Sequence, residues 1–212
     1  MLDPMALKKP SAAHTGAETR AKIINATIEC LRIDGIANLS TRAIARIGDF
    51  NQALVFYHFG SIEQLLIAAG VTESERRAAR YSDRLAHVGS FPELVKVARQ
   101  LHDEEVAQGS IAVLTQLLAA ATSSDALKQG IYAGLEPWMQ LLEAALERVL
   151  AGSPWGTALP ARELAFAMSS LFIGIEMMAG LDADRNAETR LFTTIESLGY
   201  LVDALLQMTP PA

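Results

Sequence analysis

The stretch LSTRAIARIGDFNQALVFYHFGSIEQLL, residues 39–66, contains the signals of two short helices joined by a tight turn. Ser40 is a favourable N-cap for a first helix that would end near Arg46. The Gly-Asp pair at 48–49 predicts the turn, because both residue types tolerate left-handed backbone conformations. Asn51 is a favourable N-cap for the second helix, which the next glycine would end. The stretch therefore predicts a helix-turn-helix.

Helical signals also dominate on both sides of this stretch. A capping box at 15–18 and an apolar face predict a helix over 18–33, which Gly35 would end. A second capping box at 61–64 begins a long helix that would reach residue 84 or 87. Further helices are predicted over 90–107, 110–122, 125–150 (strained near Gly134 and Pro137), 161–181 and 186–207. Strand patterns are nearly absent, so the sequence predicts an all-α fold with about nine helices.

The charge of the chain is unevenly distributed. Its 212 residues carry 18 Lys+Arg and 24 Asp+Glu, a net charge of −6, which argues against a general nucleic-acid coat. Residues 1–62 hold 7 basic and 5 acidic residues, whereas residues 63–212 hold 11 and 19. A mildly basic N-terminal part on an acidic body is a weak first indication of function. The single cysteine, Cys30, excludes an intrachain disulfide and a cysteine-rich zinc site, and we expect a buried, inert thiol.

The start of the chain does not resemble a targeting segment. Residues 1–16 lack an apolar core and are expected to form a mobile basic arm. The best membrane-like stretch, residues 164–175, has 12 uncharged residues, whereas a spanning helix needs about 20. A buried helix is therefore expected there. A single thiol and no signal peptide favour a cytoplasmic location without membrane association.

The second short helix of the opening stretch has the chemistry of a helix that contacts DNA bases. In a helix-turn-helix, the second helix lies in the major groove, with its N-terminal side chains against base edges. Asn51 and Gln52 can pair with adenine N6 and N7, and Ala53 is small enough to contact a thymine methyl. Contacts with phosphate oxygens are expected from Ser40, Thr41, Tyr57 and His58. Electrostatic attraction to the DNA backbone is expected from Arg42, Arg46, Lys8, Lys9, Arg20 and Lys22. The residues alone leave a second interpretation open, an ordinary corner of a helical domain in which Asn51 is only a cap.

Residues 18–68, and above all the Tyr-His-Phe-Gly-Ser segment at 57–61, resemble the DNA-binding domain of tetracycline-repressor (TetR) family transcriptional regulators. The resemblance implies a DNA-binding domain over 17–62 and an effector-binding and dimerisation domain over 63–212. By this resemblance, the positions that commonly contact DNA are Thr41, Gln52, Tyr57 and His58, with Arg42, Asn51 and Ala53 as secondary candidates.

Three departures from the family pattern are present. Gly48 stands where the family often has Ala, and Asp49 stands where it often has Gly. Phe56 replaces a usual Tyr, and Ile62 replaces a frequent Lys, so two phosphate contacts are lost. We expect weaker or shifted contacts with the DNA backbone. The turn itself should survive, because Asp tolerates a left-handed conformation.

Apolar residues recur at three- and four-residue steps along the last two predicted helices. In the final helix they are Leu191, Ile195, Leu198, Leu201 or Val202, and Leu205. In the preceding helix the same steps join Phe166, Ser170, Ile173 and Met177, of which Ser170 is small and polar, with Gly174 allowing close backbone approach. The stripes either face the chain's own core or pair with a second copy in a four-helix bundle. Together with the helix-turn-helix, they favour a homodimer on a palindromic operator.

An effector pocket is less visible in the sequence. Large or soft side chains suited to an apolar cavity are Tyr132, Trp138, Met139, Phe166, Phe172, Met177 and Met178. Most such residues fill cores, so only some are expected to contact an effector. Glu176, an acid isolated in an apolar helix, fits either a ligand anchor or a solvent-facing residue.

The remaining charged residues are interpreted as surface groups. His102 lies in the segment Leu-His-Asp-Glu-Glu, which predicts a solvated charged face. A ridge of arginines is expected at the surface, paired with acids of the same helix: Arg76, Arg80 and Arg84 with Glu73, Glu75 and Asp83.

Signatures of catalysis are missing from the sequence. It contains no phosphate-binding Gly-x-x-x-x-Gly-Lys loop, no Gly-x-Ser-x-Gly elbow, no His-Glu-x-x-His and no Glu-x-x-His pair of a di-iron bundle. No enzyme, cofactor or metal is therefore predicted. The predicted function is a ligand-responsive DNA-binding regulator, by family expectation a repressor released by a small apolar effector. The alternative is a helical protein-interaction adaptor, which salt-dependent DNA binding would distinguish.

Overall fold

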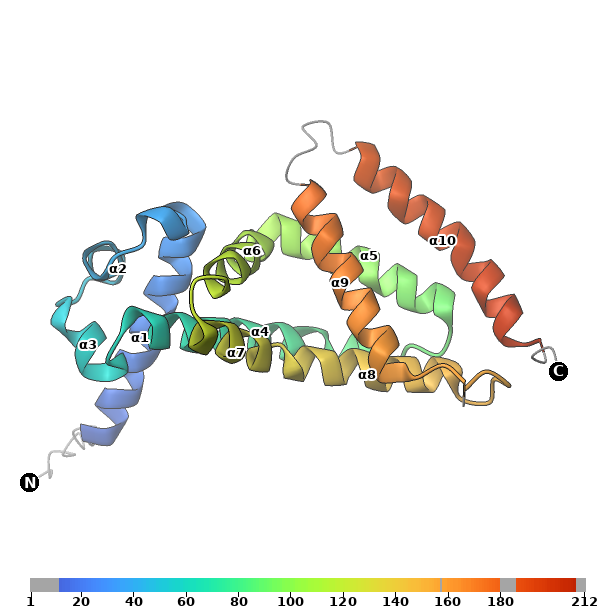
Figure 1. Ribbon diagram of the computed structural model, residues 1–212, viewed down its shortest axis with the longest axis horizontal. Coiled ribbons are helices and arrows are strands. Elements are labelled where there is room, and N and C mark those ends of the chain that lie inside the picture. The colour runs from blue at the N-terminus through green and yellow to red at the C-terminus, as the bar shows by residue number, and fades with distance from the viewer. Residues whose placement is uncertain (1–11, 157, 180–185, 209–212) are drawn as a thin grey trace, which may run out of the picture. The chain divides into compact units, whose positions relative to one another are not determined.

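The computed structural model describes residues 12–156, 158–179 and 186–208 (Figure 1). The secondary structure of these residues is helical, which confirms the predicted all-α fold class. The chain divides into two compact units, Met1–Ala69 and Gly70–Ala212. Residues 1–11 of the expected basic arm, which include Lys8 and Lys9, and the expected turn at 182–184 lie outside the described residues.

The first unit is built on a long N-terminal helix, α1, at Ala12–Ile33. It is followed by the 3-10 turn η1 at Ile36–Asn38 and by two short helices, α2 at Thr41–Gly48 and α3 at Ala53–Phe59. α1 begins earlier than the predicted residue 18 but ends, as predicted, just before Gly35, whose φ of 74° suits glycine. The buried side chains of this unit include Ile23, Ile24, Ala26, Thr27, Ile28, Cys30, Leu31, Ile44, Ala45, Val55, Leu65, Leu66 and Ala69.

The long helix α4, Ile62–Ala86, contributes to both units. Ser61 caps it as predicted, because its Oγ accepts a hydrogen bond from the Gln64 N–H at 3.1 Å. The helix is continuous through residues 69 and 70, where the two units meet in sequence.

The second unit consists of the rest of α4 and six further helices. They are α5 at Phe91–Gln108, α6 at Ser110–Ala121, α7 at Asp125–Gly134, α8 at Glu136–Leu150, α9 at Ala161–Ala179 and α10 at Asn186–Leu206. Within this unit α9 crosses α8 and packs against it, and α10 packs against α5 (Figure 1). The core between them is formed by Tyr81, Leu85, Val88, Leu94, Leu101, Leu142, Ala145, Leu146, Val149, Leu150, Ala165 and Leu206.

The helix predicted over 125–150 is in fact two helices, α7 and α8, divided at Leu135. Pro137 lies in the first turn of α8, where its missing N–H and its ring interrupt the preceding helix. Gly134 is the last residue of α7 and lies close to α4, where a Cβ at position 134 would be 3.2 Å from Val71 Cγ2. The strain expected near Gly134 and Pro137 is thus released as a helix break.

Among the described helices, none alone is long and apolar enough to cross a membrane. Only α3 and α4 taken together reach the necessary length and composition, across a bend of 71°.

Candidate functional site

The turn between α2 and α3 depends on Asp49, which adopts a left-handed conformation with φ 48° and ψ 65°. It is the one non-glycine residue with positive φ in the described part of the chain. Lys22 Nζ donates a hydrogen bond to the Asp49 carbonyl at 3.1 Å and so ties the turn to α1. The expectation that the turn survives with Asp in place of Gly is confirmed.

The neighbouring Gly48 has no room for a side chain. A Cβ there would lie 2.8 Å from Ala26 Cβ and would collide with the Phe50 ring. Phe50 therefore requires glycine at position 48, where the family often has alanine. The glycine of this turn is thus needed at position 48 for close contact. The left-handed conformation is adopted by Asp49 instead, and aspartate is one of the residue types that tolerate it.

The predicted N-cap of the second helix, Asn51, was wrong by one residue, because Gln52 occupies the N-cap position. α3 begins at Ala53. Asn51 still serves the helix start, because its Oδ1 accepts a hydrogen bond from the Ala53 N–H at 2.9 Å. Its amide oxygen is therefore occupied by the backbone, whereas the Gln52 side chain makes no capping bond. Of the two predicted adenine-binding amides, Gln52 is the less constrained.

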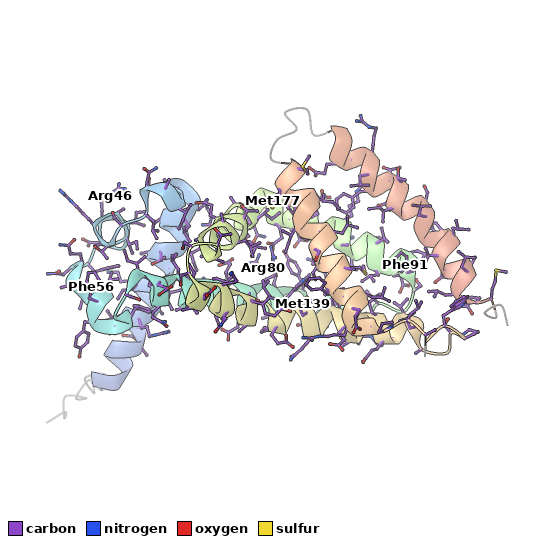
Figure 2. The ribbon with its side chains drawn as sticks, viewed as in Figure 1. Arg46, Phe56, Arg80, Phe91, Met139 and Met177 are labelled. Atoms are coloured by element: carbon purple, nitrogen blue, oxygen red, sulfur yellow. The ribbon has the colours of Figure 1, made fainter. Side chains whose placement is uncertain are left out.

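The side chains of α3 divide into a buried anchor and an exposed surface. Val55 is fully buried in the core of the first unit. Tyr57 is 82% exposed, its ring meets the His58 ring edge-on at 5.0 Å, and Phe56 is also exposed (Figure 2). The remaining predicted DNA contacts are exposed at Ser40, Arg42, Asn51, Gln52 and Ala53, and half-buried at Thr41 and His58.

Several basic residues near this surface have partners within the unit. Arg46 forms an ion pair with Asp34 at 2.9 Å, and its side chain still projects toward solvent (Figure 2). The Arg20 guanidinium lies over the Phe59 ring, 4.8 Å from its centroid. Arg20, Lys22 and Arg46, which were predicted to attract DNA phosphates, therefore also make contacts within their own unit.

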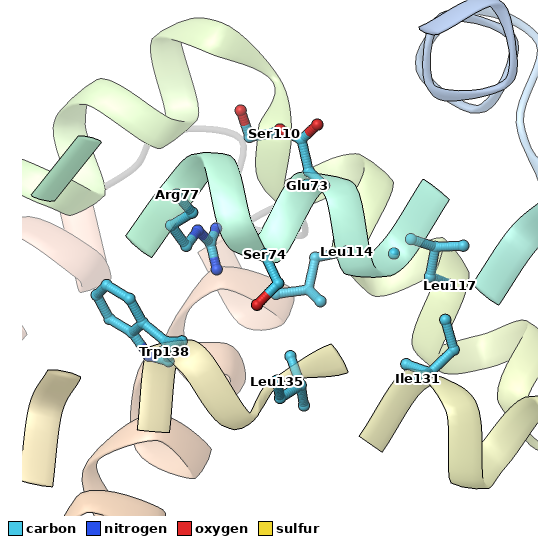
Figure 3. Close-up of a pocket in the computed structure, with 10 residues that line it drawn as sticks. Glu73, Ser74, Arg77, Ser110, Leu114, Leu117, Ile131, Leu135 and Trp138 are labelled. Carbon is cyan, nitrogen blue, oxygen red and sulfur yellow. The ribbon is translucent and has the colours of Figure 1, made fainter. Parts of the chain in front are cut away.

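A small cavity lies within the second unit, between α4, α6, α7 and α8 (Figure 3). Its polar lining comes from Glu73, Ser74, Arg77 and Ser110. Its apolar lining comes from Gly70, Leu114, Leu117, Ile131, Leu135 and Trp138.

Of the effector-binding candidates, Trp138 lines this cavity and the others lie elsewhere. Tyr132 on α7 and Phe166 and Met177 on α9 are exposed, as is Met178. Met139 is half-buried against the core of the unit, and Phe172 is half-buried with its ring 6.3 Å from that of His102. The sequence identified suitable side-chain types but could not place them on one surface.

The interpretation of His102 as a solvated residue was wrong. Its side chain is 1% exposed and lies between two carboxylates, Glu176 of α9 at Nδ1 and Glu188 of α10 at Nε2. Glu176 is itself buried rather than solvent-facing. Burial opposes the charged imidazole, but the hydrogen bonds to both carboxylates raise the pKa of His102 above its ordinary value. Burial also raises the pKa of Glu176, against the opposing effect of His102.

A second buried charge cluster was missed by the sequence analysis. Glu105 of α5 is 1% exposed and accepts hydrogen bonds from Arg77 Nε at 3.0 Å and from Tyr81 Oη at 2.8 Å. Burial raises the pKa of Tyr81 to about 12, and the bond to Glu105 acts in the same direction, so the phenol stays a donor. A periodic signal for both clusters exists in α5, since His102 and Glu105 lie 8 and 11 residues beyond the buried Leu94.

The arginine ridge also differs from its predicted pairing. Arg76 does face Glu73, at 3.9 Å. Arg80 and Arg84 instead reach across to α5, Arg80 to Glu105 at 3.5 Å and Arg84 to Glu104 at 2.6 Å. The ridge therefore joins α4 to α5 rather than stabilising α4 alone.

Neither charge cluster has the arrangement of a metal site. The described residues contain no group of three or more His, Cys, Asp or Glu side chains that could hold a metal ion.

The predicted dimer stripes leave large apolar side chains exposed on α9 and α10. The exposed stripe residues are Phe166 and Met177 on α9 and Leu191, Leu198, Leu201 and Leu205 on α10, and Leu171 and Met178 of α9, outside the predicted stripe, are exposed too. Ile173, Ile195 and Val202 are half-buried, and a Cβ at Gly174 would meet nothing within 4 Å. The exposed members of both stripes do not belong to the chain's own core.

Residues 23–69 match the model of the family described as bacterial regulatory proteins, tetR family. No curated protein matches the chain. A candidate TetR-family transcriptional regulator from Rhodococcus sp. is similar, with a TM-score of 0.69 and 20% identity over 86% of this chain and 99% of that one.

Two other solved structures are similar over most of their length. The candidate regulator SCO7518 from Streptomyces coelicolor A3(2) has a TM-score of 0.63 and 23% identity, over 86% of this chain and 98% of its own. A candidate regulator from Saccharomonospora viridis, solved in complex with choline, has a TM-score of 0.66 and 18% identity, over 85% of this chain and 95% of its own. Residues 23–69 are thus a tetR-family N-terminal domain, and the chain as a whole has the fold of TetR-family transcriptional regulators.

Proposed function

We propose that this chain is a ligand-responsive, DNA-binding transcriptional regulator that acts as a homodimer. The observation that carries the proposal is the α2–α3 helix-turn-helix within the tetR-family segment. Val55 of α3 is buried in the core of the first unit, whereas Gln52, Ala53 and Tyr57 are exposed. This arrangement supports placing α3 in the major groove, with Gln52 toward an adenine and Ala53 toward a thymine methyl. Phosphate contacts come from Ser40, Thr41, Arg42, Tyr57 and His58.

Selection of bound sequences from a pool of random DNA duplexes at moderate salt tests this proposal. A two-fold dimer places two α3 helices about one DNA turn apart, so a palindromic motif should be enriched. Retention of duplexes without any enriched motif would contradict a specific regulator. Binding to duplexes that is unaffected by salt would contradict phosphate contacts, and no binding to any duplex would favour the protein-interaction adaptor.

Substitution of Gln52 by alanine is expected to weaken binding to the selected operator by about 5- to 150-fold, the equivalent of about 1–3 kcal/mol for a bidentate base contact. Preference for the contacted base pair should relax at the same time. The measurement is a fluorescence anisotropy titration with operator DNA and with single-base variants of it.

The control is Gln100→Ala, because Gln100 is also an exposed glutamine but lies on α5, outside the helix-turn-helix. Its operator affinity should equal that of the wild type. Equal losses in the two variants, or a loss in Gln52→Ala that is the same for every DNA sequence, would remove Gln52 from the base contacts.

The exposed apolar residues of α9 and α10 support the proposal of a homodimer. A soluble monomer rarely exposes so many large side chains on adjacent elements, and a four-helix bundle with a second copy would bury them. Gly174, with open space around it, fits the close approach of a partner helix.

Substitution of Leu198 by glutamate is expected to raise the dimer dissociation constant about 100-fold or more. Leu198 is 50% exposed, and burial of a leucine contributes about 1.5–3 kcal/mol, which two-fold symmetry applies twice. Sedimentation velocity at micromolar concentration measures the change. The control is Ile33→Glu, which places the same charge on an exposed apolar residue of α1. Wild-type protein that sediments only as a monomer would overturn the dimer itself.

Ligand response is proposed to act through a shift between dimer geometries. The choline-bound neighbour of the same fold and the cavity beside Ser74 support a small-molecule effector in the second unit. Because α4 contributes to both units, it is the natural connection between this cavity and the helix-turn-helix. A coupling of about 1–3 kcal/mol would weaken operator binding about 5- to 150-fold and release a repressor from DNA.

A further inference from the structure

The cavity between α4, α6, α7 and α8 is small and mostly apolar. Its volume is about 30 Å³, which is room for roughly two water molecules. Leu117, Ile131 and Leu135 form one side of it (Figure 3). A Cβ at Gly70 would lie 2.7 Å from Ile131 Cδ1, so the absence of a side chain at position 70 preserves this space.

Ser74 places a hydrogen-bonding group in this cavity. The residue is 8% exposed, and its Oγ is one of two buried side-chain oxygens in the described residues that have no hydrogen-bond partner. Figure 3 shows the hydroxyl directed away from α4, toward the side where Leu135 and Trp138 lie. A buried hydroxyl without a partner is unfavourable, so a molecule that can hydrogen-bond there gains from doing so.

The charged residues of the lining already have partners. Arg77 donates from Nε and Nη2 to Glu105, and its guanidinium lies 5.9 Å from the Trp138 ring centroid. Glu73 faces Arg76 at 3.9 Å. A charged ligand would have to displace one of these pairs or remain uncompensated in an apolar space, and both are costly. A neutral ligand avoids that cost.

We propose that this cavity binds a small neutral hydroxyl compound, with its hydroxyl bonded to Ser74 Oγ and its apolar part against Leu117, Ile131 and Leu135. The inference rests on the proposed function, because it gives the chemical class of the effector. The cavity accommodates the hydroxyl end of the ligand, and a longer apolar part displaces the half-buried Leu114.

Saturation-transfer NMR on the full chain without DNA tests the chemical class. The probes are propan-1-ol, propylammonium and propionate, which share a three-carbon chain and differ in charge. Propan-1-ol is expected to bind and the two ions are not. Equal binding of either ion would overturn the proposal. No detectable binding of propan-1-ol at about 100 mM, a generous upper concentration for a ligand of four heavy atoms, would also overturn it.

Two serine variants test the anchor. Ser74→Ala is expected to lower the affinity for propan-1-ol about five- to tenfold, the value of one neutral hydrogen bond. Ser169→Ala is the matched control, because Ser169 Oγ is the other buried hydroxyl without a partner and lies on α9, outside this lining. Equal affinities in the two variants would show that Ser74 does not anchor the ligand.

Gly70→Ala tests the location independently of the hydroxyl. The added methyl meets the flexible end of Ile131 and narrows the cavity, so propan-1-ol binding should be lost while the operator is still bound. Because the probe-binding measurements need no DNA, failure of the site and failure of the proposed function can be distinguished. Probe binding without any selected operator would refute the proposed function and leave the site, whereas operator binding without probe binding would refute the site alone.

Discussion

Replacement of His102 by alanine is expected to lower the free energy of unfolding by about 3–5 kcal/mol, the cost of removing one partner from a buried ion pair. The imidazole lies between Glu176 and Glu188, so its removal leaves two buried carboxylates without the cation that separates them. These acids belong to α9 and α10, and His102 belongs to α5, so the loss acts on three helices of the second unit. For a chain of this length, the change corresponds to a fall in Tm of roughly 6–20 °C.

A matched control is His87→Ala. His87 directly follows α4; its side chain is 78% exposed, and its Nδ1 faces the carbonyl of Asp83 in the last turn of that helix. Its removal should change the stability by less than about 0.5 kcal/mol. In the His102→Ala background, Glu176→Gln should recover part of the loss, because it removes one buried charge. Similar Tm values for the His102 and His87 variants would contradict the buried cluster.

The same cluster gives the stability a defined dependence on pH. Hydrogen bonds to the two carboxylates outweigh burial and raise the pKa of His102, and burial raises the pKa of Glu176. Both groups hold their protons more tightly in the folded chain than in the unfolded one, so stability falls as pH rises. The contribution of His102 is complete below its unfolded pKa of about 6.5 and is lost as pH rises through its higher folded pKa.

Urea unfolding between pH 5 and 9 measures this dependence. The wild type should lose stability as the pH rises above about 6.5, and the His102→Gln variant should lose less over the same range. Two further charges act on the pKa of Glu176: Glu188, the other carboxylate of the cluster, raises it, and Arg77 of α4 lowers it. A wild-type stability that rises with pH in this range would show that His102 is not held as a cation.

The features that the sequence predicted correctly depend on contacts between near neighbours in the chain. The caps at Ser40, Ser61 and Ser90 each accept a hydrogen bond from a backbone N–H three residues later, and serine at such a position is visible in the sequence. Asp49 is similar, because its tolerance of a left-handed conformation is a property of the residue type. Local chemistry of this kind predicted the helix-turn-helix.

The features that were predicted wrongly depend on contacts between distant residues. His102 meets Glu176 and Glu188, which lie 74 and 86 residues further along the chain, whereas its acidic sequence neighbours suggested solvent. The cavity is a similar case, because the serine at position 74 becomes significant only when α6, α7 and α8 surround it. Apolar periodicity along α5 did contain a usable indication, since His102 and Glu105 continue the face of the buried Leu94 and Leu101.

Glu105→Ala is expected to destabilise the chain by about 3–5 kcal/mol, because the carboxylate joins α5 to α4 in the interior. It accepts hydrogen bonds from Arg77 and Tyr81, and Arg80 lies 3.5 Å away. Its removal leaves the nearly buried Arg77 guanidinium and the fully buried Tyr81 hydroxyl without their acceptor. Urea unfolding should show a lower midpoint with an unchanged slope if only stability changes.

The adjacent Glu104 provides the control, because the two acids occupy consecutive positions of the same helix and differ in burial. Glu104 pairs with Arg84 at 2.6 Å, and both side chains are more than one-third exposed. An exposed pair of this kind contributes about 0–1 kcal/mol, so Glu104→Ala should be nearly neutral. Arg77 also lines the cavity, so Glu105→Ala should in addition allow propionate to bind beside the released guanidinium, whereas Glu104→Ala should not. Equal stability of the two variants would place Glu105 in solvent, and no binding of propionate to the Glu105→Ala variant would separate the cavity from the charge cluster.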